Sequence, residues 1–104
     1  GESSEVLRVR VMNARRRQQE RFANTTLVAN AHMSSKHIDQ YIILDDQAKA
    51  FITQAANSLN LSPRVIHRSL KLARTIADME DVDNVSTKHI AEALQYRNKN
   101  MFIE

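Results

Sequence analysis

The sequence predicts a small all-α bundle of four to five helices. Three observations point to this class. Apolar residues recur at helical spacing in several segments, no segment alternates apolar and polar residues as a half-exposed strand does, and a Ser or Asp precedes most of the periodic segments, as a helix N-cap does. The 104 residues suffice for one domain, and 42% hydrophobic residues allow a small core to be buried.

The first predicted helix runs from residue 3 or 4 to about residue 22. Its apolar stripe, Leu7, Val11 and Ala14, has helical spacing and requires a packing partner. Residues 1–21 also contain six arginines and three glutamates, whereas residues 22–104 carry nine basic and nine acidic residues. An Arg-rich helix attracts polyanions, usually nucleic acid, but it can equally be a solvated face that keeps a domain soluble.

The middle of the chain predicts a loop and two helices. Residues 23–34 mix small, β-branched and amide side chains without a clear period, which indicates a loop. A short helix is expected from Ser34 or Ser35 to near Ile43. Asp45 is a suitable N-cap for a third helix to about Leu59, whose apolar positions are Ala48, Phe51, Ile52, Ala55 and Leu59.

Two further helices follow. Ser62 and Pro63 form a strong start signal, because the hydroxyl accepts an amide hydrogen bond and proline fits the first helical position. This fourth helix extends to about Glu80, where the acidic run 80–84 ends it. A fifth helix runs from Ser86 to roughly Arg97; its inward residues are Ile90, Ala93 and Leu94, and residues 98–104, including Met101 and Phe102, trail behind it.

Composition excludes several kinds of chemistry. One glycine and one proline leave no phosphate-binding loop or dinucleotide turn, and the absence of cysteine excludes disulfides and thiolate zinc sites. The four histidines lack the spacing of a metal site, and nothing resembles a catalytic nucleophile, so the chain alone is not expected to be an enzyme. No apolar run is long enough to span a membrane, and the amino terminus lacks the apolar core of a secretion signal. These two observations predict a cytoplasmic protein that does not bind membranes. The first residue is not Met, which indicates a piece of a longer protein.

The fourth helix carries a cationic ridge beside its apolar stripe. Arg64, Arg68 and Lys71 recur at helical spacing on one face. Arg64 falls in the first turn, where unpaired amides and the helix dipole favour an anion and a guanidinium can grip phosphate oxygens in a bidentate manner. The alternatives are a solvated face for Arg68 and Lys71, and an i,i+4 pair with Asp78 for Arg74.

Two known patterns fit this region. Residues 59–70 read like the turn and recognition helix of a helix-turn-helix, although the helical period continues through Asp78, well past what insertion into a DNA groove needs. The more specific match comprises residues 61–64, His67-Arg68, residues 73–78 and residues 89–97. Together with Arg10-Val11, Ala14-Arg15, Gln18 and Arg21-Phe22, these closely resemble the carboxy-terminal region of the magnesium-chelatase-related AAA+ ATPases of the ComM-like competence family.

The resemblance implies a division of labour within a longer ATPase. Residues 1–22 would be a basic amphipathic helix that links to an N-terminal α/β ATPase core, and residues 23–104 the helical lid. Arg64 matches the sensor 2 arginine, which contacts the γ-phosphate of ATP and in the chelatase-like branch serves a neighbouring subunit of the ring; Arg68 is a weaker neighbour.

The resemblance also implies partners. ATP and Mg²⁺ would be bound by the full-length protein, with no cofactor for this region alone. The expected partners are the α/β core, neighbouring subunits of a homo-oligomeric ring and DNA, in a motor for branch migration during transformation. The alternatives are a helix-turn-helix-like DNA-binding module and a non-catalytic helical interaction domain.

Overall fold

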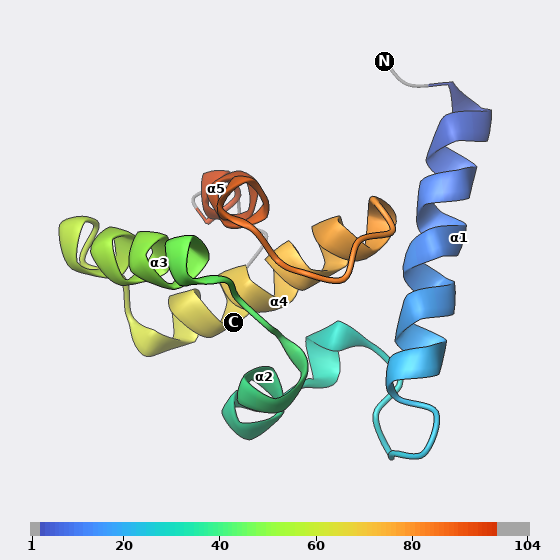
Figure 1. The fold of residues 1–104 in the computed structure, drawn as a ribbon, viewed down its shortest axis with the longest axis horizontal. Helices are drawn as coiled ribbons and strands as arrows, with labels where there is room; N and C mark the ends of the chain where they lie inside the picture. Colours follow the sequence, from blue (N-terminus) through green and yellow to red (C-terminus); the bar gives the residue numbers. More distant parts are fainter. Residues whose placement is uncertain (1–2, 98–104) are drawn as a thin grey trace.

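A computed structural model describes residues 3–97 of the chain, and these residues form an all-α bundle (Figure 1). The helices are α1 (Ser4–Arg21), α2 (Ser35–Tyr41), α3 (Asp46–Ser58), α4 (Pro63–Met79) and α5 (Thr87–Gln95), and a short 3-10 turn, η1 (Asn30–His32), lies between α1 and α2. No strand occurs in residues 3–97, where a single parallel bridge joins Leu44 to Val85. The predicted fold class is therefore confirmed. The trailing segment expected over residues 98–104, with Met101 and Phe102, lies outside the described residues.

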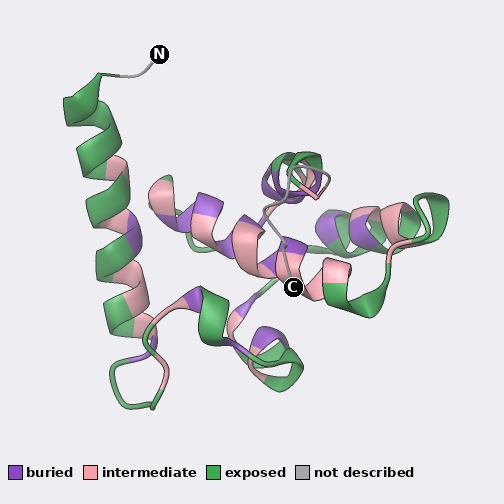
Figure 2. Ribbon diagram, turned by 180° about the vertical axis from the view of Figure 1, so that it is seen from behind, coloured by how far each residue is buried: buried purple, intermediate pink, exposed green. Residues whose placement is uncertain are grey.

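Helix α4 is the central element of the bundle. It packs against α1, η1, α2 and α5, and α3 packs against α5. Figure 2 shows that its buried residues lie on the side toward these neighbours. The core is formed by Phe22, Met33, Ile38, Ile42, Ala48, Ile52, Leu70, Ala73, Ile76, Ala77, Val85, Ile90, Ala93 and Leu94. The predicted inward residues of α5 are all in this core.

The helices begin where the sequence predicts. Ser3, Asp45 and Ser62 each accept a hydrogen bond from the amide three residues on, at 3.2, 2.7 and 3.2 Å. Pro63 occupies the first turn of α4, as expected. The prediction of an unbroken loop over residues 23–34 is wrong at η1, because tertiary contacts fix that turn. The amide of Asn30 donates to Gln18 Oε1 at 2.9 Å, and the Asn30 side chain is buried.

Two helices end on residues with positive φ, and neither is glycine. Asn60 follows α3 with φ 53° and Asp81 follows α4 with φ 62°. In each case the next amide reaches back to the helix: Leu61 N–H donates to Ala56 O at 3.0 Å and Val82 N–H to Ala77 O at 3.1 Å. This is the Schellman arrangement, in which Asn and Asp are the residues that best replace glycine.

Helix α1 is packed over only part of its length. Of its predicted apolar stripe, Ala14 is buried, whereas Leu7 and Val11 are exposed. Figures 1 and 2 show why: the turns nearest the N-terminus extend past the end of α4 and away from the other helices. Among residues 3–97, Ala14 is therefore the only residue of this predicted stripe that is buried. No helix among the described residues combines the length and apolar character needed to cross a membrane.

Candidate functional site

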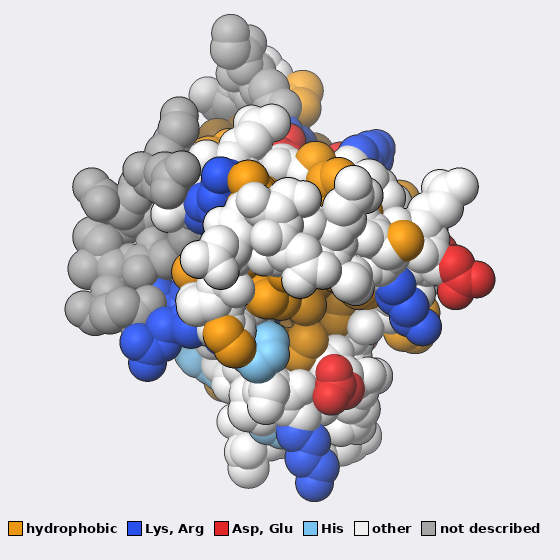
Figure 3. Space-filling view, turned by 90° about the vertical axis from the view of Figure 1, so that its left-hand side faces the viewer, with side chains coloured by type: hydrophobic (Ala, Val, Ile, Leu, Met, Phe, Trp, Pro, Cys, Tyr) orange, Lys and Arg blue, Asp and Glu red, His pale blue; other side chains and the backbone are white. Residues whose placement is uncertain are grey.

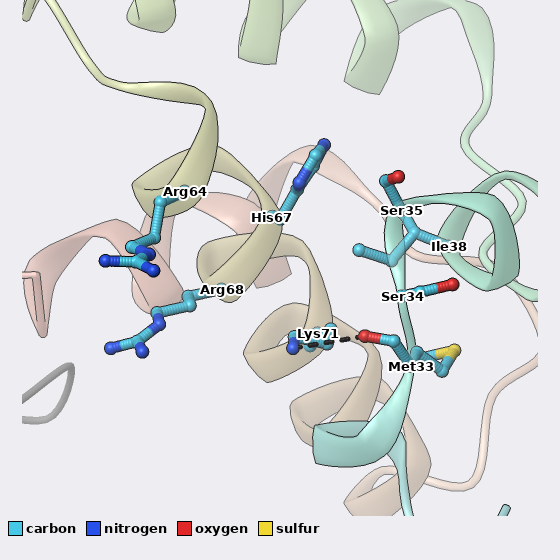
Figure 4. A pocket seen from close by; sticks show the side chains of 8 residues that line it. All are labelled: Met33, Ser34, Ser35, Ile38, Arg64, His67, Arg68 and Lys71. Atoms are coloured by element: carbon cyan, nitrogen blue, oxygen red, sulfur yellow. Dashed lines mark hydrogen bonds between the residues drawn. The ribbon is translucent and has the colours of Figure 1, made fainter. Parts of the chain in front are cut away.

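A cleft of about 420 Å³ lies between α4 and the segment that leads into α2. It is lined by Met33, Ser34, Ser35, Ile38, Arg64, His67, Arg68 and Lys71 (Figure 4). Met33 and Ile38 are buried and give it an apolar floor. Figure 3 shows one face of the molecule, where hydrophobic side chains and a histidine border a hollow. The cleft thus combines apolar surface with three cationic side chains.

The start of α4 places the two arginines of the cleft. The Ser62 cap fixes where the helix begins, so Arg64 falls in the first turn and Arg68 one turn later, on the same side. Figure 4 shows both side chains extending next to each other along the outer side of α4, while His67 points toward α2. Arg64 is exposed and Arg68 is half-buried. The side chain of Arg64 is therefore exposed to solvent at the rim of the cleft.

Lys71 has a different role from the two arginines. Its ammonium donates to the carbonyl oxygens of Ala31 and Met33, at 3.2 and 3.3 Å. Burial lowers the pKa of Lys71, and the nearby charge of Arg68 lowers it further. Lys71 is thus half-buried and not simply a solvated residue, because its side chain folds back onto the backbone between η1 and α2. It fastens the wall of the cleft opposite Arg64.

Comparison with known proteins assigns the chain to a family. The family model described as magnesium chelatase, subunit ChlI C-terminal, matches residues 1–97. The chain belongs to this family. The match confirms the resemblance and covers every described residue, including the cleft.

Two similar proteins come from bacteria. The competence protein ComM of Haemophilus influenzae is 40% identical over 97 residues, and a protein of Salmonella typhimurium named YifB, uncharacterized, is 37% identical. The alignments cover 93% of this chain but only 18% of each relative. The chain therefore spans less than a fifth of the curated relatives it matches. No solved structure matches it.

Arg74 lies outside the cleft and belongs to a buried ion network. Its predicted pair with Asp78 is confirmed, with Nε and Nη2 at 3.1 and 3.0 Å from Oδ1. Arg21 of α1 grips the same carboxylate through two hydrogen bonds of 2.8 and 2.9 Å, and Asn30 Nδ2 donates to it at 2.9 Å. Burial lowers the pKa of Arg74, an effect opposed by the charge of Asp78. Sequence analysis missed Arg21 and Asn30.

Two more arginines of α1 bind the acidic run after α4. Arg16 and Arg17 lie 2.6 and 2.7 Å from Asp81 Oδ1, and Arg17 also lies 2.9 Å from Asp83. The hydrogen bond from Arg17, followed by that from Arg16, holds the pKa of Asp81 below its usual value. The acidic run was expected only to end the helix. In the sequence, residues 15–21 are rich in arginine and residues 78–83 are rich in acidic residues. This complementary charge is the feature that could have predicted the ion pairs between the two segments.

Two of the four histidines, His37 and His89, are parts of helix caps. His37 Nδ1 accepts from the Ser34 amide at 3.1 Å, and His89 Nδ1 accepts from the Ser86 amide at 3.0 Å. His89 Nε2 also lies 3.0 Å from Glu80 Oε1. Within residues 3–97, no group of three metal-ligating side chains is close enough together to hold an ion.

Proposed function

We propose that this domain is the lid of an AAA+ ATPase and that Arg64 contacts the γ-phosphate of bound ATP. The observation that carries the proposal is the position of Arg64: exposed, in the first turn of a capped helix of 17 residues, with Arg68 beside it and a cleft behind it. The positive end of the helix dipole and two guanidinium groups all favour a phosphate at this place.

The chemistry assigned to Arg64 is charge stabilisation. A phosphoryl group in transfer spreads negative charge over its equatorial oxygens, and a guanidinium held in place neutralises that charge without reorganising. Because α4 is packed on four other elements, Arg64 moves with the whole bundle. Loss of the γ-phosphate would break this contact and release the lid as a rigid body.

The remaining parts of the site would come from other regions and other subunits. The α/β core of a full-length polypeptide would bind ATP and Mg²⁺, and Arg64 would act in the chain's own site or in that of a neighbour in a homo-oligomeric ring. The 40% identity to a competence protein supports a DNA-processing motor in the cytoplasm as the machine that uses this lid.

The direct test replaces Arg64 in the full-length protein. We expect Arg64→Ala to lower kcat for ATP hydrolysis by about 100-fold or more, in line with the loss of one oriented donor at a developing charge. Arg64→Lys should be intermediate, because lysine keeps the charge but loses the planar fork. Lys49→Ala removes an exposed cation on α3 and should leave hydrolysis unchanged. Circular dichroism of the 104-residue chain should be the same for all variants. Normal turnover by Arg64→Ala would remove this residue from the site.

The helix-turn-helix alternative has less support. A recognition helix lies in the major groove and contacts base edges through exposed residues, whereas no residue of α4 from Val65 to Met79 is exposed. If the alternative holds, the 104-residue chain shifts duplex DNA in a gel with a steep dependence on salt. No shift at low salt would dispose of it.

A further inference from the structure

The outer half of α1, residues 4–13, exposes an unusual set of side chains. Val6, Leu7 and Val9 are each 49% exposed, Val11 is 37% exposed and Met12 is 59% exposed. Large apolar residues on a soluble surface normally occur singly, whereas these five lie within about two turns of one helix. Such a concentration indicates a surface that is covered in the working protein.

The apolar residues of this outer half lie on opposite sides of the helix. Leu7 and Val11, four residues apart, share one side, and Val9 and Met12, three residues apart, share the other. A helix bound flat on a lipid surface has its apolar residues on one side only, and so does a helix bound to one flat protein face. Apolar residues on both sides instead require a partner that encloses the helix.

Charge distinguishes between the possible partners. Residues 4–15 carry three arginines and one glutamate, so their net charge stays positive although Arg8 pairs with Glu5 at 2.7 Å. Two copies of this segment would bring like charges together in an apolar contact, which is unfavourable. The complementary partner has an apolar groove with an acidic rim.

We propose that the outer half of α1 is enclosed by such a groove in the part of the full-length polypeptide that precedes this domain. The chain covers only 18% of its relatives, and any preceding polypeptide would join at the outer end of α1, where the N-terminus lies in Figure 1. The inference rests on the proposed function in one respect, that this domain works attached to an ATPase core. The inner half of α1 is held by Arg16, Arg17 and Arg21, so the helix would connect the two parts rigidly.

The test uses two methionines of the chain as probes. Met12 is 59% exposed and Met33 is 3% exposed, so hydrogen peroxide should oxidise Met12 much faster than Met33 in the 104-residue chain. In the full-length protein without nucleotide, diluted until it is monomeric, we expect the oxidation rate of Met12 to fall roughly tenfold or more, toward that of Met33. Peptide mass spectrometry measures both rates.

The other outcomes each overturn the proposal. Unchanged oxidation of Met12 in the full-length protein would mean that nothing covers the helix. If Met12 of the 104-residue chain becomes more protected from oxidation as the concentration rises, a second copy covers the helix. If Met12 is protected only in assembled rings, a neighbouring subunit covers it. If Met12 is protected only when anionic phospholipid vesicles are present, a membrane surface covers it. The oxidation experiment contains no nucleotide. A result that overturns the enclosed helix is therefore independent of the result that would overturn the proposed function, which is normal ATP hydrolysis by Arg64→Ala.

A variant pair provides a second readout. Leu7→Gln with Met12→Gln should leave the Tm of the 104-residue chain unchanged and lower the Tm of the full-length protein, because only the latter loses buried apolar contacts. Val28→Gln replaces a valine that is 72% exposed in the loop after α1 and should change neither. Equal Tm values for full-length wild type and double variant would contradict an enclosed helix.

Discussion

At the scale of single residues, Asp78 is the point where separate parts of the chain meet. Its carboxylate is fully buried and binds Arg74, Arg21 and Asn30. The sequence predicts only the first of these, because an i,i+4 spacing on a helix is a local pattern. Arg21 and Asn30 are 57 and 48 residues away from Asp78, and no local rule connects positions so distant. The same limit applies to the cleft: the sequence predicts Arg64 and Arg68, but not Ser34 or Met33 opposite them.

Asp78→Asn should destabilise the chain strongly. The substitution leaves the Arg74 guanidinium, which is 2% exposed, without its counter-charge, and breaking a buried pair in this way costs about 3–5 kcal/mol. Asp83→Asn is the matched control, since the Asp83 side chain is 89% exposed and its pair with Arg17 should contribute less than about 1 kcal/mol. Urea denaturation followed by circular dichroism measures both free energies of unfolding. Similar small losses for the two variants would show that the buried pair is not needed.

At the scale of helices, the boundaries could be predicted well because their causes are local. The hydroxyl or carboxylate caps and the apolar spacing of α3, α4 and α5 lie within a few residues of the ends they determine. The packing of α1 could not be predicted in this way. Its outer half has apolar residues at helical spacing but no neighbour among residues 3–97, and spacing alone does not indicate whether a neighbour exists.

The two serine caps should therefore differ in effect. Ser3 and Ser62 accept the same hydrogen bond at the same distance of 3.2 Å, but Ser62 caps the central helix whereas Ser3 caps the outer half of α1. We expect Ser62→Ala to lower the free energy of unfolding by about 1 kcal/mol, and Ser3→Ala to fray only the first turn. Denaturation midpoints and amide hydrogen exchange of the 104-residue chain separate the two effects. A global loss for Ser3→Ala equal to that for Ser62→Ala would mean that α1 folds as one unit with the core.

At the scale of the whole molecule, carboxylates next to the end of α4 join it to α5 and to α1. Glu80 accepts a hydrogen bond from His89 Nε2 and also binds Lys88 Nζ, both at 3.0 Å. The hydrogen bond from His89, and then that from Lys88, lowers the pKa of Glu80, as Arg17 and Arg16 do for Asp81. A carboxylate whose pKa is lower in the folded state stabilises the fold above its unfolded pKa, and this stabilisation disappears as the pH falls through the folded value.

The chain should accordingly lose stability in acid. The usual pKa values of these two groups are 4.5 and 3.8, so we expect Tm to decrease as the pH falls below about 4.5 and to continue decreasing below 3.8. The variant Glu80→Gln with Asp81→Asn should have a lower Tm at pH 6 and a flatter profile in this acidic window. Calorimetry from pH 6 to acid measures the profile. A wild-type profile parallel to that of the variant would exclude these two carboxylates as a source of the acid sensitivity.

Asp81 sits at one end of α4 in a left-handed conformation and holds α1, while Arg64 sits at the other end beside the cleft. Helix α4 has 17 residues and is therefore about 25 Å long. If a ligand at the Arg64 end tilts this rod by about 5°, the attachment point of α1 swings by about 2 Å, a length comparable to the shifts seen at switching helix interfaces. If Arg64 binds a phosphate as proposed, the geometry of the bundle would convert a small rotation at that end of α4 into a displacement at its attachment to α1.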